Sequence, residues 1–244
     1  MKNKIGVFDS GVGGLTILSE LYKKYPNESY IYIGDNKNSP YGDKTSLELF
    51  NYGKRIIDYF IENGVNIVVI GCNTTCSTVF DKLSKLYKDI TIIGVIDATI
   101  NKFLDTNKSN VLVIGTNATI KSNIYENKIK EKNISIRVHS LATPKLVPLI
   151  ENNLDVDLVI NEYLEPYKDI DSIILGCTHY KLIENSIRKD IEIINSSDGV
   201  VLELSKYFSN ENEPNIKIYT TGDVNQFNRL CNKIMNINGE YLNL

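Results

Sequence analysis

The feature that most constrains the fold of this chain is a short pattern that occurs three times. The segments are Val-Val-Ile-Gly-Cys-Asn-Thr at 68–74, Val-Leu-Val-Ile-Gly-Thr-Asn at 111–117 and Ile-Ile-Leu-Gly-Cys-Thr-His at 173–179. Each is a strand-like apolar run that ends at a glycine, followed by a small polar residue that opens a predicted helix. We infer two similar α/β halves, each with a cysteine at the carboxyl end of a strand, where open α/β sheets bind ligands. The alternative is that glycine after a strand is common turn chemistry and the likeness is coincidental.

Strand-like runs alternate with helical patterns along the chain. Apolar residues recur at three- and four-residue spacing over 15–25 and 49–61, as they do on one face of a helix. Because the predicted strands are short and solidly apolar, we predict an α/β fold with mainly parallel sheets covered by helices. The predicted strands are Lys4–Phe8, Tyr30–Gly34, Asn66–Gly71, Thr91–Val95, Asn110–Gly115, Ile134–Ser140, Ser172–Gly176, Ile191–Asn195 and Asn215–Thr220.

The composition excludes several classes of protein. Of the 244 residues, 42% are hydrophobic and 23% are charged, which are ordinary values for a globular chain. A net charge of −3 makes a poor binder of nucleic acid or anionic membranes, and no apolar stretch approaches the roughly 18 residues of a membrane span. Asp9 interrupts the first apolar run too early for a signal peptide, and four cysteines are too few for a disulfide framework. We therefore expect a cytoplasmic protein of one large or two small domains, with reduced thiols.

Two of the four cysteines, Cys72 and Cys177, hold matching positions at predicted helix starts. A thiol there lies at the positive end of the helix dipole, so we expect its pKa to fall from about 8.5 toward neutrality. An ordinary buried thiol is the alternative for either residue taken alone. Cys76, one helical turn after Cys72, and Cys231, in an amphipathic terminal helix, are interpreted as packing residues. A zinc site of these thiols and His179 has suitable ligands but lacks the usual zinc-knuckle spacing, so we predict no metal.

The loop after the first predicted strand places Asp9-Ser10 ahead of three glycines within residues 11–14. It does not match the dinucleotide pattern G-x-G-x-x-G. The glycines permit a close approach by a ligand, and the helix start behind them can hold a carboxylate or a phosphate. Asp9 is therefore a candidate acid, base or partner for an ammonium group. The alternative is that Asp9 or Ser10 only caps the helix.

Other polar residues have weaker signals when they are read alone. Pro40-Tyr41-Gly42 reads as a turn with an exposed tyrosine, and Glu151 reads as a carboxylate on a helix surface. His139 ends a predicted strand and reads as a satisfied core or surface histidine. His179 lies two residues from Cys177, where it could tune that thiol or donate to a developing charge.

Two thiols that face one ligand from opposite sides could invert a stereocentre. One thiolate would remove a proton from one face, while the other thiol would deliver a proton to the opposite face. This chemistry needs no metal, flavin or pyridoxal phosphate. The negative charge that develops on a neighbouring carboxylate needs fixed hydrogen-bond donors. Suitable donors near the two thiols in sequence or pattern are Ser10, Asn73, Thr74 and Thr178.

Four motifs together resemble the glutamate racemases of the aspartate/glutamate racemase superfamily. They are Phe8-Asp-Ser-Gly-Val-Gly-Gly-Leu15, Pro40-Tyr-Gly42, Cys72-Asn-Thr74 and Leu175-Gly-Cys-Thr-His-Tyr180, and they stand in the family's order. The resemblance implies two similar α/β domains with mainly parallel sheets and the active site in the cleft between them. It places residues 1–96 and 210–244 in the first domain, to which the carboxyl-terminal segment returns, and residues 97–209 in the second.

The same resemblance implies a cofactor-independent interconversion of L- and D-glutamate, with D-glutamate supplied for peptidoglycan synthesis. Cys72 would act on the α-proton of the D-isomer and Cys177 on that of the L-isomer. Asp9 and His179 would assist the neighbouring thiols. No metal or cofactor is implied, no nucleic acid or membrane is expected as a partner, and a homodimer is expected because the family is often dimeric. The implied substrate-binding residues are Asp9, Ser10, Tyr41, Gly42, Asn73, Thr74, Thr178, His179 and Glu151.

Two alternatives stay open at this point. One is a racemase for aspartate or another amino acid, and the other is a non-catalytic α/β protein that binds an amino acid. His179 favours glutamate, because the aspartate-specific relatives that the second cysteine motif resembles typically carry Glu at that position. The chain departs from the family pattern at Thr75, Cys76 and Lys181, which bears on rate and regulation more than on reaction type.

Overall fold

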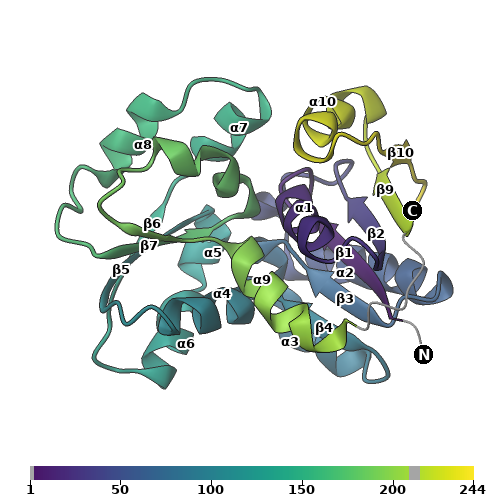
Figure 1. The fold of residues 1–244 in the computed structure, drawn as a ribbon, viewed down its shortest axis with the longest axis horizontal. Helices are drawn as coiled ribbons and strands as arrows, with labels where there is room; N and C mark the ends of the chain where they lie inside the picture. Colours follow the sequence, from purple (N-terminus) through teal and green to yellow (C-terminus); the bar gives the residue numbers. More distant parts are fainter. Residues whose placement is uncertain (1–2, 209–214) are drawn as a thin grey trace.

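The computed structural model describes residues 3–208 and 215–244, and Figure 1 shows two parallel sheets side by side with helices around each. Within these residues the larger sheet has the strand order β10-β9-β2-β1-β3-β4. Its central strand β1 pairs with β2 on one side and β3 on the other, and five of its six residues are buried. The strands of this sheet are β1 (Lys4–Asp9), β2 (Ser29–Gly34), β3 (Ile67–Ile70), β4 (Thr91–Gly94), β9 (Asn215–Thr220) and β10 (Glu240–Tyr241).

The smaller sheet has the order β6-β5-β7-β8, and its described strands also pair in parallel throughout. Gly115 at the end of β5 lies opposite Gly176 at the end of β7, so the residues behind these glycines emerge at the same edge. The strands are β5 (Asn110–Gly115), β6 (Arg137–Ala142), β7 (Ser172–Gly176) and β8 (Glu192–Ile194). Both sheets are parallel, and their inner strands β1, β3, β5 and β7 are buried, as expected of continuous apolar strands.

Helices follow the strands and cover the sheets. A capping box starts the longest one, α2, because the side chains of Thr45 and Glu48 each accept a hydrogen bond from the backbone N–H of the other residue. The α-helices are α1 (Leu15–Lys24), α2 (Ser46–Glu62), α3 (Asn73–Leu86), α4 (Val95–Leu104), α5 (Asn117–Lys121), α6 (Ile124–Lys132), α7 (Leu146–Glu151), α8 (Asp157–Leu164), α9 (Ser196–Leu204) and α10 (Val224–Met235). The 3₁₀ helices are η1 (Tyr41–Asp43), η2 (Thr178–Ser186) and η3 (Ser205–Tyr207).

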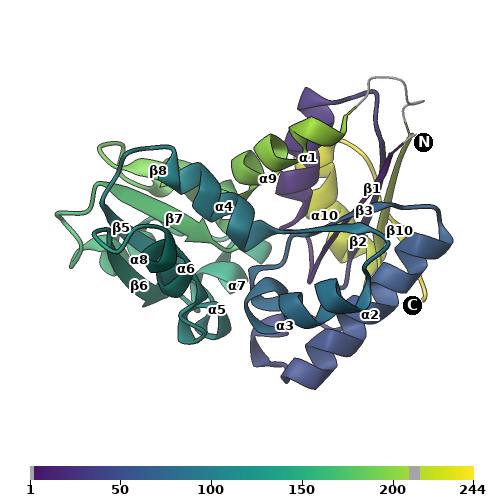
Figure 2. The same ribbon diagram turned by 90° about the horizontal axis from the view of Figure 1, so that it is seen from below.

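The chain crosses between the sheets twice, through α4 and α9, which Figure 2 shows side by side between the two parts of the molecule. Their backbones approach so closely that a Cβ atom at Gly199 would overlap the carbonyl oxygen of Ala98. Helix α9 also packs against α1 of the larger sheet. The two crossings therefore form one packed helix pair that fixes how the sheets lie relative to each other.

The predicted fold class is confirmed, and three predicted strands, 110–115, 172–176 and 215–220, have the bounds observed. The strand predicted at 134–140 instead spans 137–142, since Ile136 donates its backbone N–H to Asn133 in a turn. Strand β10 was not predicted. Among the residues that the structure describes, no helix has both the length and the apolar character needed to cross a membrane.

Candidate active site

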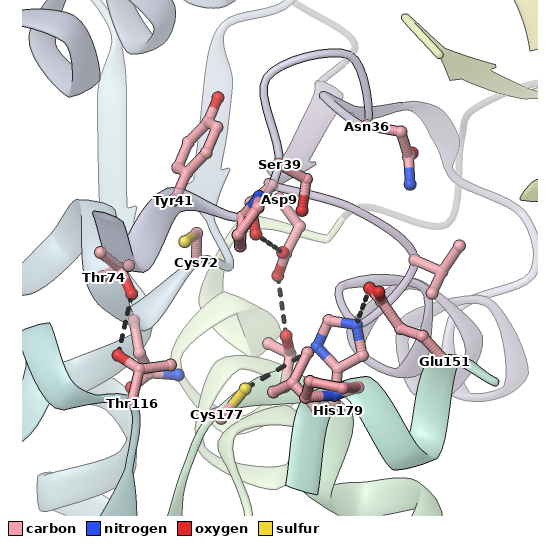
Figure 3. Close-up of a pocket in the computed structure, with 18 of the residues that line it drawn as sticks. Asp9, Asn36, Ser39, Tyr41, Cys72, Thr74, Thr116, Glu151, Cys177 and His179 are labelled. Atoms are coloured by element: carbon pink, nitrogen blue, oxygen red, sulfur yellow. Dashed lines mark hydrogen bonds and ion pairs between the residues drawn. The ribbon is translucent and has the colours of Figure 1, made fainter. Parts of the chain in front are cut away.

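A cavity of about 600 Å³ lies where the carboxyl ends of strands from both sheets meet (Figure 3). Polar residues that come directly after five strands line it, as expected for parallel α/β sheets. They are Asp9 and Ser10 at the end of β1, Cys72 after β3, Thr116 after β5, Thr143 after β6, and Cys177 after β7. The cavity thus collects the strand ends that the repeated sequence pattern singled out.

The two cysteines of the repeated pattern line this one cavity, although they follow strands of different sheets. Cys72 and Cys177 are both buried, with 5% and 8% of their surface exposed, and neither forms a disulfide. Cys76 and Cys231 lie outside the cavity lining, where their thiols donate to the backbone carbonyls of Ile70 and Ile237. The cavity therefore holds two free thiols, one from each sheet.

The expected lowering of the pKa of Cys72 is wrong. Burial raises the pKa of the Cys72 thiol to about 11, and the negative charge of Asp9 adds to this, against the weaker effect of hydrogen bonds from Thr75 and Ser10. The prediction took account of the dipole of α3, which lowers the pKa of a thiol, but not of the burial of the thiol, which raises it. The predicted helix start at Cys177 is confirmed, and the helix is the 3₁₀ helix η2, with Cys177 as its N-cap.

Asp9 is buried and accepts two hydrogen bonds, from the Thr178 hydroxyl at 2.9 Å and from the Ser10 hydroxyl at 3.1 Å. Burial raises the pKa of Asp9 above its ordinary value, although the charge of His179 and these two hydrogen bonds act in the opposite direction. Helix α1 has Gly14 as its N-cap and no side-chain cap, so the alternative that Asp9 or Ser10 only caps the helix is wrong.

His179 lies between a thiol and a carboxylate. Its Nδ1 is 3.7 Å from Sγ of Cys177, and its Nε2 is 3.0 Å from Oε1 of Glu151, as Figure 3 shows. Burial alone would lower the pKa of His179, but hydrogen bonds with Cys177 and Glu151 and their negative charges raise it well above its ordinary value. The hydrogen bond with His179 lowers the pKa of Glu151. Glu151, the last residue of α7, is therefore a half-buried helix-end carboxylate that faces the cavity and binds His179.

The two residues that follow Cys72 in the chain form hydrogen bonds with residues from the smaller-sheet half of the molecule. Thr74 and Thr116 join their hydroxyls at 3.1 Å, and the hydroxyl of Tyr125 donates to Oδ1 of Asn73 at 2.7 Å. Thr116 and Tyr125 were not among the predicted site residues. The sequence did carry a signal for Thr116, since it occupies the position in segment 111–117 that Cys72 and Cys177 occupy in the other two segments.

Tyr41 and Gly42 also line the cavity, from the 3₁₀ helix η1. The expectation of an exposed tyrosine is wrong, because Tyr41 is buried and its hydroxyl donates to Oδ2 of Asp35 at 2.6 Å. Asp35 itself is fully buried, with Oδ1 bonded to Thr221, and it does not line the cavity. One further face of the cavity was not predicted and comes from Asp223, Gln226, Phe227 and Leu230, at the start of and along α10.

Within residues 3–208 and 215–244, no group of three or more His, Cys, Asp or Glu side chains is placed to hold a metal ion. His139 lies outside the cavity lining, where its Nε2 is 3.0 Å from Oδ1 of Asn110. The titratable side chains that line the cavity include the two thiols, Asp9 and the His179–Glu151 pair.

Comparison with known proteins agrees with this arrangement. Residues 40–202 match the family described as Asp/Glu/hydantoin racemase. The chain is 36% identical over 234 residues to a glutamate racemase of a Hydrogenobaculum species. The aligned region covers 91% of this chain and 89% of the relative. Two crystal structures of glutamate racemases, each 33% identical, superpose on almost the whole chain. The first, an isoform from Bacillus anthracis, has a TM-score of 0.90, with 99% of this chain and 97% of that chain covered. The second, from Francisella tularensis in complex with D-glutamate, has a TM-score of 0.88, with 98% and 96% covered.

A family match over most of the chain and relatives above 30% identity across nearly its full length lead to one assignment. The chain belongs to the Asp/Glu/hydantoin racemase family, among its glutamate racemases, and is an amino-acid racemase.

Proposed function

We propose that this protein interconverts L- and D-glutamate by a two-thiol 1,1-proton transfer without a cofactor. The observation that carries the proposal is that Cys72 and Cys177 reach one cavity from two different sheets. A single base returns a proton to the face of the carbon from which the proton came, whereas two groups on opposite sides of the carbon can invert its configuration. The comparisons supply the substrate, since one structural relative was solved with D-glutamate.

The proton balance of the step is simple. With D-glutamate bound, the Cys72 thiolate removes the α-proton and becomes a thiol, while the Cys177 thiol delivers its proton to the opposite face and becomes a thiolate. The C–H bond that breaks is replaced by a C–H bond on the other side, and L-glutamate results. The reverse reaction starts from the Cys177 thiolate and L-glutamate.

Each thiol has a buried partner that helps its proton to leave. The high pKa of Cys72, about 11, means that its thiolate forms only when a base takes the proton. We assign that task to Asp9, whose carboxylate is held in place by Thr178 and Ser10. On the other side, the raised pKa of His179 keeps its ring positively charged, so that it stabilises the thiolate of Cys177. Glu151 fixes the orientation of that ring.

The remaining lining residues would hold the substrate. A carbanion next to a carboxylate spreads negative charge onto the carboxylate oxygens, which need donors fixed in advance. Asn73 and Thr74 line the cavity and would serve as such donors, and the hydroxyls of Ser10 and Thr178, which donate to Asp9 in this structure, would turn to the carboxylate when substrate binds. Asp9 and Glu151 are the acids nearest to serve the ammonium group, and Tyr41 and Gly42 close the cavity from η1. We extend the proposal to a cytoplasmic homodimer whose D-glutamate supplies peptidoglycan synthesis, on the strength of the family resemblance.

The test uses purified protein, D-glutamate, EDTA and reductant in heavy water, without pyridoxal phosphate. We expect the circular dichroism of the glutamate to decay as deuterium enters the α-carbon of the product. Turnover of aspartate but not glutamate would transfer the proposal to the other branch of the family. A folded protein with free thiols that binds glutamate without exchanging its α-proton would be a binding protein, and the proposal would fall.

A further inference from the structure

One buried polar atom of a residue that lines the cavity has no hydrogen-bond partner in the described part of the chain. Nδ2 of Asn73 is buried without an acceptor, although Asn73 is 97% buried and its side chain lines the cavity. A buried amide donor without an acceptor is costly, so such an atom is expected where a ligand supplies the acceptor. The carboxylate of an amino acid is an acceptor of this kind.

The other end of the same amide is occupied. Oδ1 of Asn73 accepts the hydroxyl of Tyr125 at 2.7 Å in a fully buried hydrogen bond. Tyr125 lies on α6, beside the smaller sheet, and its ring is so close to β7 that a Cβ at Gly176 would lie 3.4 Å from it. It does not line the cavity itself. The bond therefore reaches from the smaller sheet to the first residue of α3 behind the larger one.

We propose that Tyr125 is a positioning residue that fixes the polarity of the Asn73 amide, so that the NH₂ end faces a carboxylate of the substrate. The inference deepens the proposed function and rests on it. Tyr125 would act only through Asn73 and would not touch the substrate.

The reason lies in the near-identical shape of the two ends of an amide. Sterically, Asn73 could turn by 180° and present Oδ1 to the cavity, where it would repel a carboxylate instead of binding it. A buried tyrosine hydroxyl needs an acceptor, and Asn73 Oδ1 provides one. Burial raises the pKa of Tyr125 above its ordinary value, so its hydroxyl keeps its proton and stays a donor. The donor role of Tyr125 thus selects one orientation of the amide.

The test measures KM and kcat for both glutamate isomers in Tyr125→Phe, together with the affinity for D-glutamate by calorimetry. Phenylalanine keeps the ring that packs against β7 and removes only the hydroxyl. We expect KM and the dissociation constant to rise about tenfold, the effect of one lost polar contact, while kcat falls less than about threefold. A residue that serves only stability would lower the unfolding temperature and leave KM of the folded enzyme unchanged.

A double-mutant cycle isolates the path through the amide. In an Asn73→Ala background there is no amide to orient, so adding Tyr125→Phe should cause no further rise in KM. Tyr30→Phe is the matched control, because its buried hydroxyl donates to the carbonyl of Tyr25 at 3.0 Å, away from the cavity. We expect Tyr30→Phe to lower stability and to leave KM unchanged.

The outcomes separate this inference from the proposed function. Suppose that the wild-type protein racemises glutamate. If Tyr125→Phe then leaves KM unchanged, or raises KM by the same factor in the Asn73→Ala background as in the wild type, the role of Tyr125 is refuted and the proposed function stands. If the wild-type protein neither binds nor racemises glutamate, the proposed function fails and the inference fails with it. Should Tyr125→Phe not fold, Asn73→Asp gives a second decision, since it presents an oxygen at both ends. Wild-type affinity for D-glutamate in that variant would overturn the inference.

Discussion

The hydroxyl of Thr178 donates to Oδ2 of Asp9 at 2.9 Å, and this bond joins the end of β1 in the larger sheet to the start of η2 behind the smaller sheet. The loop after β1 permits this contact because Gly13 has no side chain. A Cβ atom there would lie 2.5 Å from Nδ1 of His179 and would also overlap the Thr178 hydroxyl. The positions of Asp9, Thr178 and His179 relative to one another therefore depend on the absence of a side chain at Gly13.

Replacing Gly13 with alanine should separate these groups. We expect Gly13→Ala to lower kcat/KM for glutamate about a hundredfold, because Thr178 and His179 must both move from their places at the cavity. Steady-state kinetics on folded protein measure the effect. Gly53→Ala is the matched control, since its Cβ would meet Leu83 at 2.8 Å outside the cavity lining. It should reduce stability but not kcat/KM, and equal kinetic losses in both variants would contradict the prediction.

The two thiols should be individually essential. Cys72→Ser and Cys177→Ser should each reduce racemisation by about 10²–10⁴-fold, because a hydroxyl is a much weaker acid than a thiol. The circular dichroism of the protein should not change. Cys231→Ala, which removes a buried thiol away from the cavity, should keep full turnover. Near-normal activity in either serine variant would exclude the two-thiol mechanism.

The charge of Asp9 should be visible in the reactivity of Cys72. Burial and the Asp9 carboxylate together raise the pKa of Cys72 to about 11, so Asp9→Asn should lower that pKa. Alkylation of Cys72 by iodoacetamide at pH 8, followed by peptide mass spectrometry, should become about tenfold faster for each unit by which the pKa falls. Racemisation should fall at the same time, because the base is lost. Glu151→Gln serves as the control, and an alkylation profile unchanged by Asp9→Asn would refute the coupling.

The His179–Glu151 pair should give stability a defined pH window. Hydrogen bonds raise the pKa of His179 above its ordinary value of 6.5, so its contribution is complete below pH 6.5 and is lost as pH rises through the raised pKa. The pKa of Glu151 lies below its ordinary value of 4.5, so its contribution is present above pH 4.5 and is lost as pH falls through the lowered pKa.

Glu151→Gln should therefore destabilise the protein most between pH 5 and 6.5, by about 1–3 kcal/mol. Urea unfolding of both proteins across pH 4–9 measures the difference. His139, whose ring lies 3.0 Å from Oδ1 of Asn110 and edge-on to Tyr167, outside the cavity lining, supplies the control His139→Gln, which should not reproduce this window. A difference that stays constant over the whole range would show that the pair is not ionised as inferred.

The sequence predicted two strands with their observed bounds where apolar residues run without interruption up to a glycine. Strands β5 and β7 have the form Asn-Val-Leu-Val-Ile-Gly and Ser-Ile-Ile-Leu-Gly, and both were placed correctly. Strand β10 is only Glu240–Tyr241, and it exists because those residues pair with the end of β9. A strand of two residues is too short to produce a recognisable pattern in the local sequence.

The site was harder to predict than the fold because its electrostatics depend on burial. A dipole argument for Cys72 used only the helix that follows it, whereas the surroundings that raise its pKa come from β1 and the packed core. Tyr41 similarly reads as a turn residue until its hydroxyl finds Asp35 inside the molecule. Tyr125 has no motif of its own, and its hydroxyl reaches the site through the long-range hydrogen bond to Asn73.

The position of β9 between β2 and β10 has a consequence for the order in which the protein matures on the ribosome. The smaller sheet is complete once residues 110–194 have been made, and Cys177 is then already in its place. In the larger sheet, β2 pairs with β1 on one side only until residues 215–220 have been synthesised and can form β9 on its other side. That edge of β2 therefore stays unpaired until β9 has been synthesised. A chain truncated before residue 215 would lack β9 and would expose that edge of β2 to pairing with another strand.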